Sequence, residues 1–260
     1  MYAVYQGLSG SGDHDPDLMY EERYYRKKMV PGDMVAFKSV EYETDLFVAV
    51  AKGVPVVDLK SAVAKEIRRA RRTLTDYQKV HPGFFECLEP QSVLPGDPEI
   101  VTRMKRAGQA AGVGPMAAVA GAVSAQVADG ALSACPEFIL ENGGDLLVRT
   151  KKRRRVAVET GRSPFKGLKL ILEGADAPRG ICTSSGVMGH SLSFGKADAA
   201  TVISEDVYLA DAVATALGNR LKSADDISSA LAWIQKIPGI LGALVIIEGQ
   251  LGAWGDIVLD

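Results

Sequence analysis

The amino-acid sequence predicts an α+β protein with antiparallel sheets and with its helices on one face. Three observations lead to this class. Short strand-like segments come in pairs separated by turns, the helical segments are grouped between those pairs, and the same order of elements occurs twice. No sequence repeat accompanies the repeated order. We therefore expect one domain over 23–260, built of two similar halves at about 30–150 and 155–260, after a loose Gly/Ser/Asp-rich segment at 1–22.

The first half is predicted to hold a strand hairpin, two helical regions and a second hairpin. Asp58 is placed to cap the first helix, whose apolar residues recur at helical spacing. The second helical region has a middle of small apolar residues. Asn142 and Gly143 form the strongest short signal for a hairpin turn, because both turn residues must tolerate a positive φ. The expected elements are strands at 34–40 and 46–51, helices at 59–74 and 99–129, and two strands within 136–150.

The second half is predicted to supply strands, two helices and a last strand pair. The run KKRRR at 151–155 lies at the junction of the halves, where an exposed hairpin end is its default explanation. The expected strands are 155–160, 168–174, 180–185, 200–205, 243–249 and 255–259, and the expected helices are 207–220 and 224–235.

Composition excludes several classes of function. The chain has 260 residues, 30 Lys plus Arg and 32 Asp plus Glu, so the near balance of charge predicts no nucleic-acid surface. No apolar run of about 18 residues occurs, and we expect no membrane segment. Cys87, Cys135 and Cys182 are widely spaced and form no CxxC pair, which favours a reducing compartment. We therefore expect a cytoplasmic protein.

A carboxylate and a hydroxyl are spaced for one helix face in the segment YLADAVATALGNRL. Asp211 and Thr215 are four residues apart, so both could contact one small hard cation such as Mg²⁺. The alternative is structural. Thr215 would then hydrogen-bond to the carbonyl of Asp211, and Asp211 would sit near the helix start because of the helix dipole.

Two further segments combine glycines with polar side chains. The segment CTSSGVMGHSLSFGKADA, at 182–199, offers hydroxyl donors and flexible backbone to a phosphate, or it is an exposed Ser/Gly loop. Its His190 could be a base, a nucleotide contact or a structural histidine. The segment ENGGDL, at 141–146, is a hairpin turn whose glycines would also allow the main chain to approach a ligand.

The order of these motifs resembles the ApbE-like superfamily of FAD:protein FMN transferases. GPMAAVAGA is followed by ENGGDL, by TSSG with a histidine, and by ADAVATAL, and the likeness is strongest to an uncharacterised branch. The resemblance implies tandem β-β-α-α-β-β units in an ApbE-like, T-fold-like arrangement. It also implies binding of FAD and Mg²⁺ and transfer of FMN to a protein hydroxyl.

The resemblance carries site residues over motif by motif. It implies that Asp211 and Thr215 bind the metal and that His190 is catalytic. The glycine loop and the TSG segment would bind the flavin nucleotide through Asn142, Gly143, Gly144, Asp145, Ser184, Ser185 and Gly186.

Other readings stay open at this point. One is hydrolysis of FAD to FMN and AMP, and another is a non-catalytic protein that kept the fold and binds a ligand or partner. The expected partners are a flavin nucleotide and an acceptor protein, and the sequence leaves a homodimer open.

Overall fold

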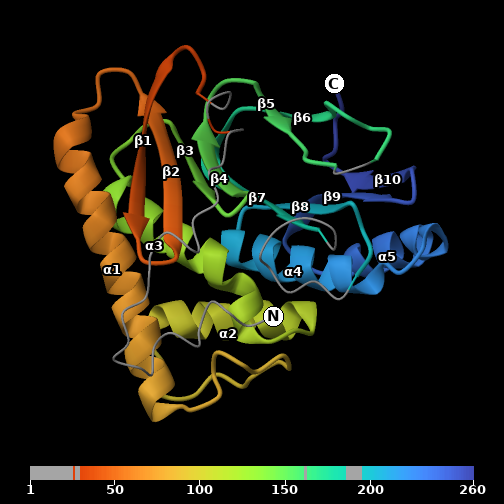
Figure 1. Ribbon diagram of the computed structural model, residues 1–260, viewed down its shortest axis with the longest axis horizontal. Coiled ribbons are helices and arrows are strands. Elements are labelled where there is room, and N and C mark those ends of the chain that lie inside the picture. Colours follow the sequence, from red (N-terminus) through yellow and green to blue (C-terminus); the bar gives the residue numbers. More distant parts are fainter. Residues whose placement is uncertain (1–25, 27–29, 161–162, 186–194) are drawn as a thin grey trace.

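The computed structural model describes residue 26 and residues 30–160, 163–185 and 195–260, and its centre is one eight-stranded antiparallel sheet. The helices pack against one face of this sheet, and a separate two-stranded sheet lies over the other face (Figure 1). The strand order is β1-β2-β3-β4-β7-β8-β9-β10. Each half of the chain therefore contributes four neighbouring strands, and the halves join where β4 pairs with β7.

In the first half, a hairpin is followed by three helices and a second hairpin that returns to pair with the first. Strand β3 pairs with β2, so the helices between them cross over one face of the sheet. The elements are β1 (Met34–Glu41), β2 (Thr44–Ala51), α1 (Val56–Val80), α2 (Glu99–Ala111), the 3₁₀ helix η4 (Pro115–Ala118), α3 (Val119–Ala131), β3 (Phe138–Asn142) and β4 (Asp145–Thr150).

The second half repeats that arrangement with shorter helices. Strand β9 pairs with β8 as β3 pairs with β2. The elements are β7 (Ala175–Ser184), β8 (Ala199–Ser204), α4 (Val207–Arg220), η5 (Ala224–Asp226), α5 (Ile227–Ile234), β9 (Ile240–Ile247) and β10 (Gln250–Gly255). The two-stranded sheet between the halves consists of β5 (Arg154–Ala157) and β6 (Lys169–Leu172).

The expected α+β class, with antiparallel strands and helices on one face, is confirmed, but the placement of three strands was wrong. The segments 155–160 and 168–174 do not begin the second half, because β5 and β6 pair only with one another in a separate sheet. The last strand is 250–255 rather than 255–259. Glu248 and Gly249 have φ values of 50° and 71°, which makes a two-residue hairpin turn and sets the register of β10 against β9.

Two helix assignments also differ from expectation. The helical region 99–129 is broken, because Gly112 ends α2 in the left-handed conformation and Pro115 starts η4. Asp58 does not cap α1. The helix begins at Val56 directly after Pro55, whose ring fixes a φ that suits a helix start, and Asp58 falls in the first turn.

The basic run at 151–155 is neutralised by acidic residues from several elements. Arg154 contacts Asp33 at 2.8 Å and Glu137 at 2.9 Å, which ties β5 to the starts of β1 and β3. The other pairs are Lys151–Asp176, Lys152–Asp33, Arg153–Glu173 and Arg155–Asp260. The run therefore connects strands and leaves no unopposed block of positive charge.

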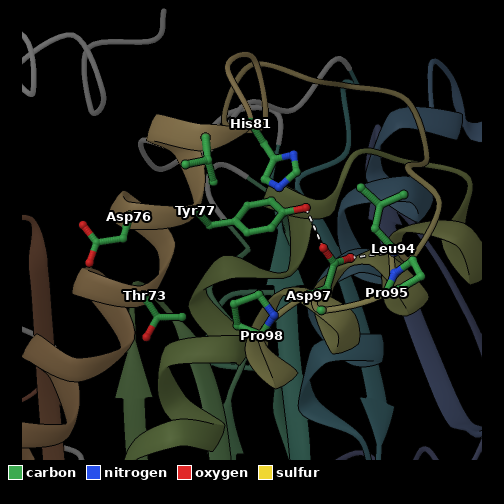
Figure 2. Close-up of a pocket in the computed structure, with 10 residues that line it drawn as sticks. Thr73, Asp76, Tyr77, His81, Leu94, Pro95, Asp97 and Pro98 are labelled. Carbon is green, nitrogen blue, oxygen red and sulfur yellow. Dashed lines mark hydrogen bonds between the residues drawn. The ribbon is translucent and has the colours of Figure 1, made fainter.

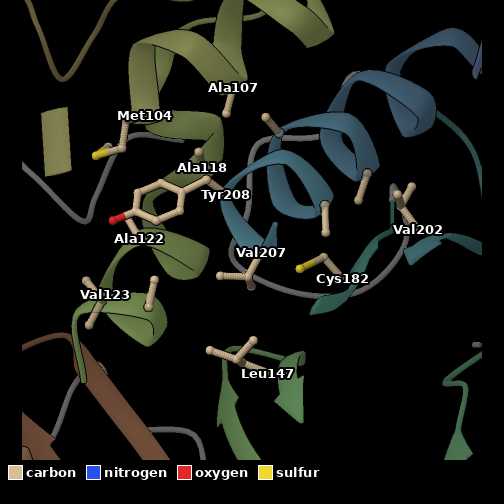
Figure 3. Close-up of a cluster of buried hydrophobic side chains, with 14 of the residues drawn as sticks. Met104, Ala107, Ala118, Ala122, Val123, Leu147, Cys182, Val202, Val207 and Tyr208 are labelled. Carbon is tan, nitrogen blue, oxygen red and sulfur yellow. The ribbon is translucent and has the colours of Figure 1, made fainter. Parts of the chain in front are cut away.

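The main core lies between the helices and the sheet. Figure 3 shows Ala118, Ala122 and Val123 from η4 and α3 beside Val207 and Tyr208 of α4, with Leu147 of the sheet below Val207 and Cys182 to its right. Small residues let the helices pack closely here. Within the described residues, no single helix is long and apolar enough to span a membrane, and the bent pair Glu99–Ala111 and Pro115–Ala131 meets that criterion by length and composition only.

Truncating a core side chain of β3 should destabilise the whole sheet. Leu140 has no exposed surface, so we expect Leu140→Ala to lower the free energy of unfolding by about 2–5 kcal/mol. Val57 is 81% exposed, and Val57→Ala should change it by less than about 0.5 kcal/mol. Equilibrium urea denaturation measures both. Equal effects of the two substitutions would contradict this assignment of the core.

Candidate functional site

Two aspartates from distant parts of the chain meet at the junction of the halves. Asp145 is the first residue of β4, directly after the ENGG turn, and Asp211 lies in the second turn of α4. Their carboxyl groups lie close enough for each to act on the pKa of the other. Asp211 is buried, with 8% of its surface exposed, and Asp145 is half-buried.

The surroundings disfavour two negative charges on this pair. Loss of solvation raises the pKa of Asp211 well above its ordinary value, and the nearby Asp145 raises it further. Loss of solvation also raises the pKa of Asp145, and the charge of Glu141 acts in the same direction. The pair therefore holds a proton at pH values at which isolated aspartates are ionised.

Asp211 also accepts a hydrogen bond from the start of α3. Its Oδ2 atom accepts from the backbone N–H of Gly121 at 2.8 Å. This N–H group lies in the first turn of α3, where it has no partner inside its own helix, and the residue at the N-cap position, Ala118, cannot supply one. Asp211 thus caps α3 from a neighbouring helix, which is a structural role distinct from the one expected.

The junction is too tight for side chains at two glycines. A Cβ atom on Gly121 would lie 2.5 Å from the carbonyl oxygen of Val207, at the start of α4. A Cβ on Gly180 of β7 would lie 2.8 Å from the Cα of Val207. The start of α3 and strand β7 both approach the start of α4 through these glycines, which fixes the position of Asp211.

The ENGG turn is held on both faces of the sheet. Asn142 donates from Nδ2 to the carbonyl of Ala120 at 3.0 Å, on the helix side. The Oε1 atom of Glu141 accepts from the N–H of Gly144 at 2.7 Å. Gly143 and Gly144 have φ values of 70° and 105°, so the turn needs glycine at both positions. These contacts bring the predicted glycine loop to Asp211.

The strand that carries TSS runs beside Asp145. The N–H of Thr183 donates to Asp145 Oδ1 at 3.0 Å, and the buried thiol of Cys182 lies near the same carboxyl group. Burial raises the pKa of Cys182 well above its ordinary value, and the two aspartates raise it further, so the thiol stays protonated. Cys182 is therefore a neutral neighbour of Asp145.

The structure describes only some of the predicted site residues that follow Thr183. Ser184 ends β7, and its buried Oγ has no hydrogen-bond partner in the described part of the chain. Ser185 follows it and is half-buried, and Gly186 and His190 lie outside the described residues.

Thr215 is half-buried one turn after Asp211, and among the described residues no hydrogen bond joins its hydroxyl to the Asp211 carbonyl. The structural alternative, in which the Thr215 hydroxyl donates to the carbonyl of Asp211, is therefore not found among the described residues.

Metal ligands of other kinds do not surround the aspartate pair. In the ranges 30–160, 163–185 and 195–260, no group of three or more His, Cys, Asp or Glu side chains is arranged to hold a metal ion. Any cation here would take its ligands from the two aspartates, from hydroxyl groups and from molecules bound with it. That mixed shell suits Mg²⁺ better than Zn²⁺.

A second polar cluster lies at the far end of α1 and shares no residue with this site. Lys105, which is 2% exposed, donates to Asp97 Oδ2 and to the Tyr77 hydroxyl, each at 2.8 Å. Figure 2 shows Tyr77 donating to Asp97 under the stacked ring of His81. A surface hollow of about 460 Å³ opens beside them. These groups satisfy one another, so we assign the cluster to fastening the segment 82–98 onto α1 and α2.

The architecture and the paired motifs define an ApbE-like α+β protein, and comparison with known proteins agrees. A family described as AbpE bacteria matches residues 26–253, and the chain belongs to that family. A UPF0280 protein of Methanosarcina acetivorans is 42% identical over 198 residues, covering 75% of this chain and 78% of the relative. The expected membership of the ApbE-like superfamily is thereby confirmed.

Solved structures share the fold at low sequence identity. Flavin transferase ApbE from Vibrio cholerae matches with a TM-score of 0.57 and 14% identity, covering 86% of this chain and 97% of that one. The apo flavinyl transferase ApbE of Pseudomonas stutzeri matches with a TM-score of 0.57 and 13% identity, covering 85% and 94%. At such identities the likeness establishes the fold.

Several residues of the site were not found from the sequence. Cys182 directly precedes the TSS segment and could have been included on that ground. Gly121 was noted only as one of many small residues, and nothing in the sequence links Glu141 to Arg26, which is its partner across 115 positions. Contacts between residues so far apart in the chain form only when the protein folds, and no local sequence pattern predicts them.

Adding one methyl group at Gly121 should separate α3 from α4. Helix propensity alone would make Gly121→Ala stabilising by about 1 kcal/mol. We expect a loss of about 1–3 kcal/mol in the free energy of unfolding instead, because the new Cβ would clash with the Val207 carbonyl. Gly32 faces open space, so Gly32→Ala is the control and should be nearly neutral. Urea denaturation measures both variants. If Gly121→Ala is more stable than wild type, α3 and α4 are not in close contact at Gly121.

The shared proton should make stability depend on pH. Above pH 3.8 an aspartate in the unfolded chain loses its proton, whereas the folded pair keeps one, so the wild-type protein loses stability as the pH rises from there. Asp211→Asn keeps the size of the side chain and replaces its titrating carboxyl group with a neutral amide. The stability of the variant relative to wild type should therefore increase between about pH 4 and pH 7. Denaturation in EDTA measures this, and a difference that is constant with pH would contradict a shared proton.

Proposed function

We propose that this protein is a Mg²⁺-dependent flavin nucleotide enzyme that transfers FMN from FAD to a hydroxyl group of an acceptor protein. The observation that carries the proposal is the close pair of Asp145 and Asp211 beside the glycine turn, each with its pKa raised by burial. Two such carboxyl groups are costly to ionise together unless a cation lies between them. A divalent cation could replace the shared proton and allow both to be ionised.

The side chains around the pair fit a magnesium ion. Asp145 and Asp211 would hold the ion, with Thr215 one turn further along α4. Mg²⁺ usually keeps several waters or phosphate oxygens in its remaining positions, so few protein ligands are needed. When bound, the ion would neutralise charge on the diphosphate of FAD.

Other groups of the site would orient the nucleotide. The exposed turn at Gly143 and Gly144 lets main chain approach a phosphate, and the hydroxyl of Ser184, which has no hydrogen-bond partner among the described residues, could donate to it. In the transfer, the acceptor oxygen forms a bond to the phosphorus of FMN, the diphosphate bond breaks, and AMP leaves. The acceptor hydroxyl gives up its proton, and we propose His190 as the group that takes it.

The family and its fold neighbours support a flavin-related role. Two of the matched structures are named as flavin transferases. Hydrolysis of FAD would use the same groups with water in place of the acceptor hydroxyl, so the products distinguish the two reactions.

Metal and nucleotide should bind cooperatively. Two carboxylates hold a hydrated ion weakly unless phosphates complete its shell, so FAD with Mg²⁺ should raise the melting temperature by more than the sum of their separate effects. Asp211→Asn should abolish this excess and lower AMP release by about 100-fold. Asp225→Asn, at an aspartate in η5 outside the site, is the matched control and should change neither.

The outcomes separate the three readings of the protein. Cooperative binding with FMN attached to an added acceptor supports transfer, and AMP with free FMN indicates hydrolysis. Additive thermal shifts with no AMP from the wild-type protein would reject the enzyme and favour a non-catalytic ligand-binding role.

A further inference from the structure

A buried arginine from outside the sheet lies against the strands that carry the glycine turn. Arg26 is 2% exposed, and its guanidinium group reaches β2 and β3. Its Nε donates to Glu141 Oε2 at 2.5 Å, one terminal nitrogen donates to Asp45 Oδ1 at 2.6 Å, and the other donates to the Asp45 carbonyl at 2.9 Å. Phe47 of β2 lies 6.0 Å from the guanidinium. Three hydrogen bonds thus fix the orientation of the planar guanidinium group.

The acidic partners of Arg26 are buried as well. Glu141 has no exposed surface, and Asp45 is 8% exposed. A buried carboxylate is costly without a charged partner, and Arg26 contacts both of these groups. Lysine could not match this arrangement, because it lacks the rigid fork of donors.

Glu141 links Arg26 to the carboxylate site. One of its oxygens faces Arg26, and the other accepts the N–H of Gly144 in the turn. Asp145 follows that glycine directly, and the charge of Glu141 acts on the Asp145 carboxyl group. On the opposite face, Asn142 holds the same turn to Ala120. The turn is therefore fixed from the helix side by Asn142 and from the other side by Glu141 with Arg26.

We propose that Arg26 is a positioning residue of this site, which acts through Glu141 to hold the Gly143–Gly144 turn where Asp145 meets Asp211. Its effect on catalysis rests on the proposed function, but its effect on the turn does not. The proposal extends the site to a residue that precedes the first strand of the sheet and touches neither aspartate of the pair.

The chain offers a matched control for this test. Arg154 also bridges two carboxylates, Asp33 and Glu137, and its side chain is only 12% exposed. Its partners lie at the starts of β1 and β3, away from the turn. Arg154→Met should therefore remove a comparable set of ion pairs without changing the site.

The experiment compares Arg26→Met, Arg154→Met, Glu141→Gln and the double variant Arg26→Met/Glu141→Gln by two measurements. The first is amide hydrogen exchange at Gly144, and the second is the dissociation constant of FAD in the presence of Mg²⁺. Arg26→Met should accelerate exchange and weaken FAD binding, each by about tenfold, because Glu141 loses its charged partner. Arg154→Met should leave both unchanged.

The double variant provides the rescue. The glutamine introduced by Glu141→Gln carries no charge that needs Arg26, and its side-chain oxygen can still accept from the N–H of Gly144. The double variant should recover both quantities to within about threefold of wild type. If Arg26→Met does not fold, Arg26→Lys takes its place, and we expect it to show the same two defects more weakly.

Two results would overturn the proposal. One is wild-type exchange at Gly144 in Arg26→Met or, if that variant does not fold, in Arg26→Lys. The other is an equal change in Arg154→Met, which would show a general loss of stability. If wild-type protein does not bind FAD with Mg²⁺, the proposed function fails, and the exchange data alone still decide the role of Arg26.

Discussion

The contact between Asp145 and Asp211 is the constraint on which the architecture at the junction depends. It joins a strand of the first half to a helix of the second, and it places two acidic groups where solvation is poor. A fold selected for stability alone would gain from replacing such a pair with neutral partners, since buried like charges raise each other's pKa and oppose ionisation. The pair is retained beside a glycine turn and a hydroxyl-rich strand, which is the arrangement a cation and a phosphate would need.

The surrounding structure serves to hold this pair in place. The helix start at Gly121 donates to Asp211, and Asn142 and Glu141 hold the turn that leads into Asp145. Glycine allows α3 and β7 to approach α4 closely enough for those bonds. The same contacts have a second consequence, because Asp211 also accepts from a donor of α3 that has no partner in its own helix. The structural role of Asp211 and its proposed functional role therefore fall on one side chain, and only a substitution that keeps this hydrogen bond can separate them.

The local sequence predicted the elements better than their assembly. Hairpins and amphipathic helices follow from periodicity and turn residues, so the α+β class and most strands were found. The errors arose where contacts between distant parts of the chain determine which sheet a strand joins and in which register. β5 and β6 alternate like sheet strands, but they form their own sheet, and β10 takes its register from the turn at Glu248 and Gly249. For the site, the four-residue spacing singled out Asp211 and Thr215 as candidate metal ligands, and the resemblance added Asp145 as a candidate nucleotide-binding residue. These roles stay predictions. The contacts of Arg26 with Asp45 and Glu141 have a range that no spacing encodes.

Proton release on cation binding tests the central claim most directly. If the pair shares one proton that a divalent cation displaces, titration of the FAD-bound protein with Mn²⁺ near neutral pH should release about one proton per ion. Calorimetry in two buffers of different ionisation enthalpy gives that number, and Asp211→Asn should reduce it to near zero. Binding of Mn²⁺ to the wild-type protein with no proton release would contradict the account, because the cation would then lie elsewhere or the pair would hold no proton.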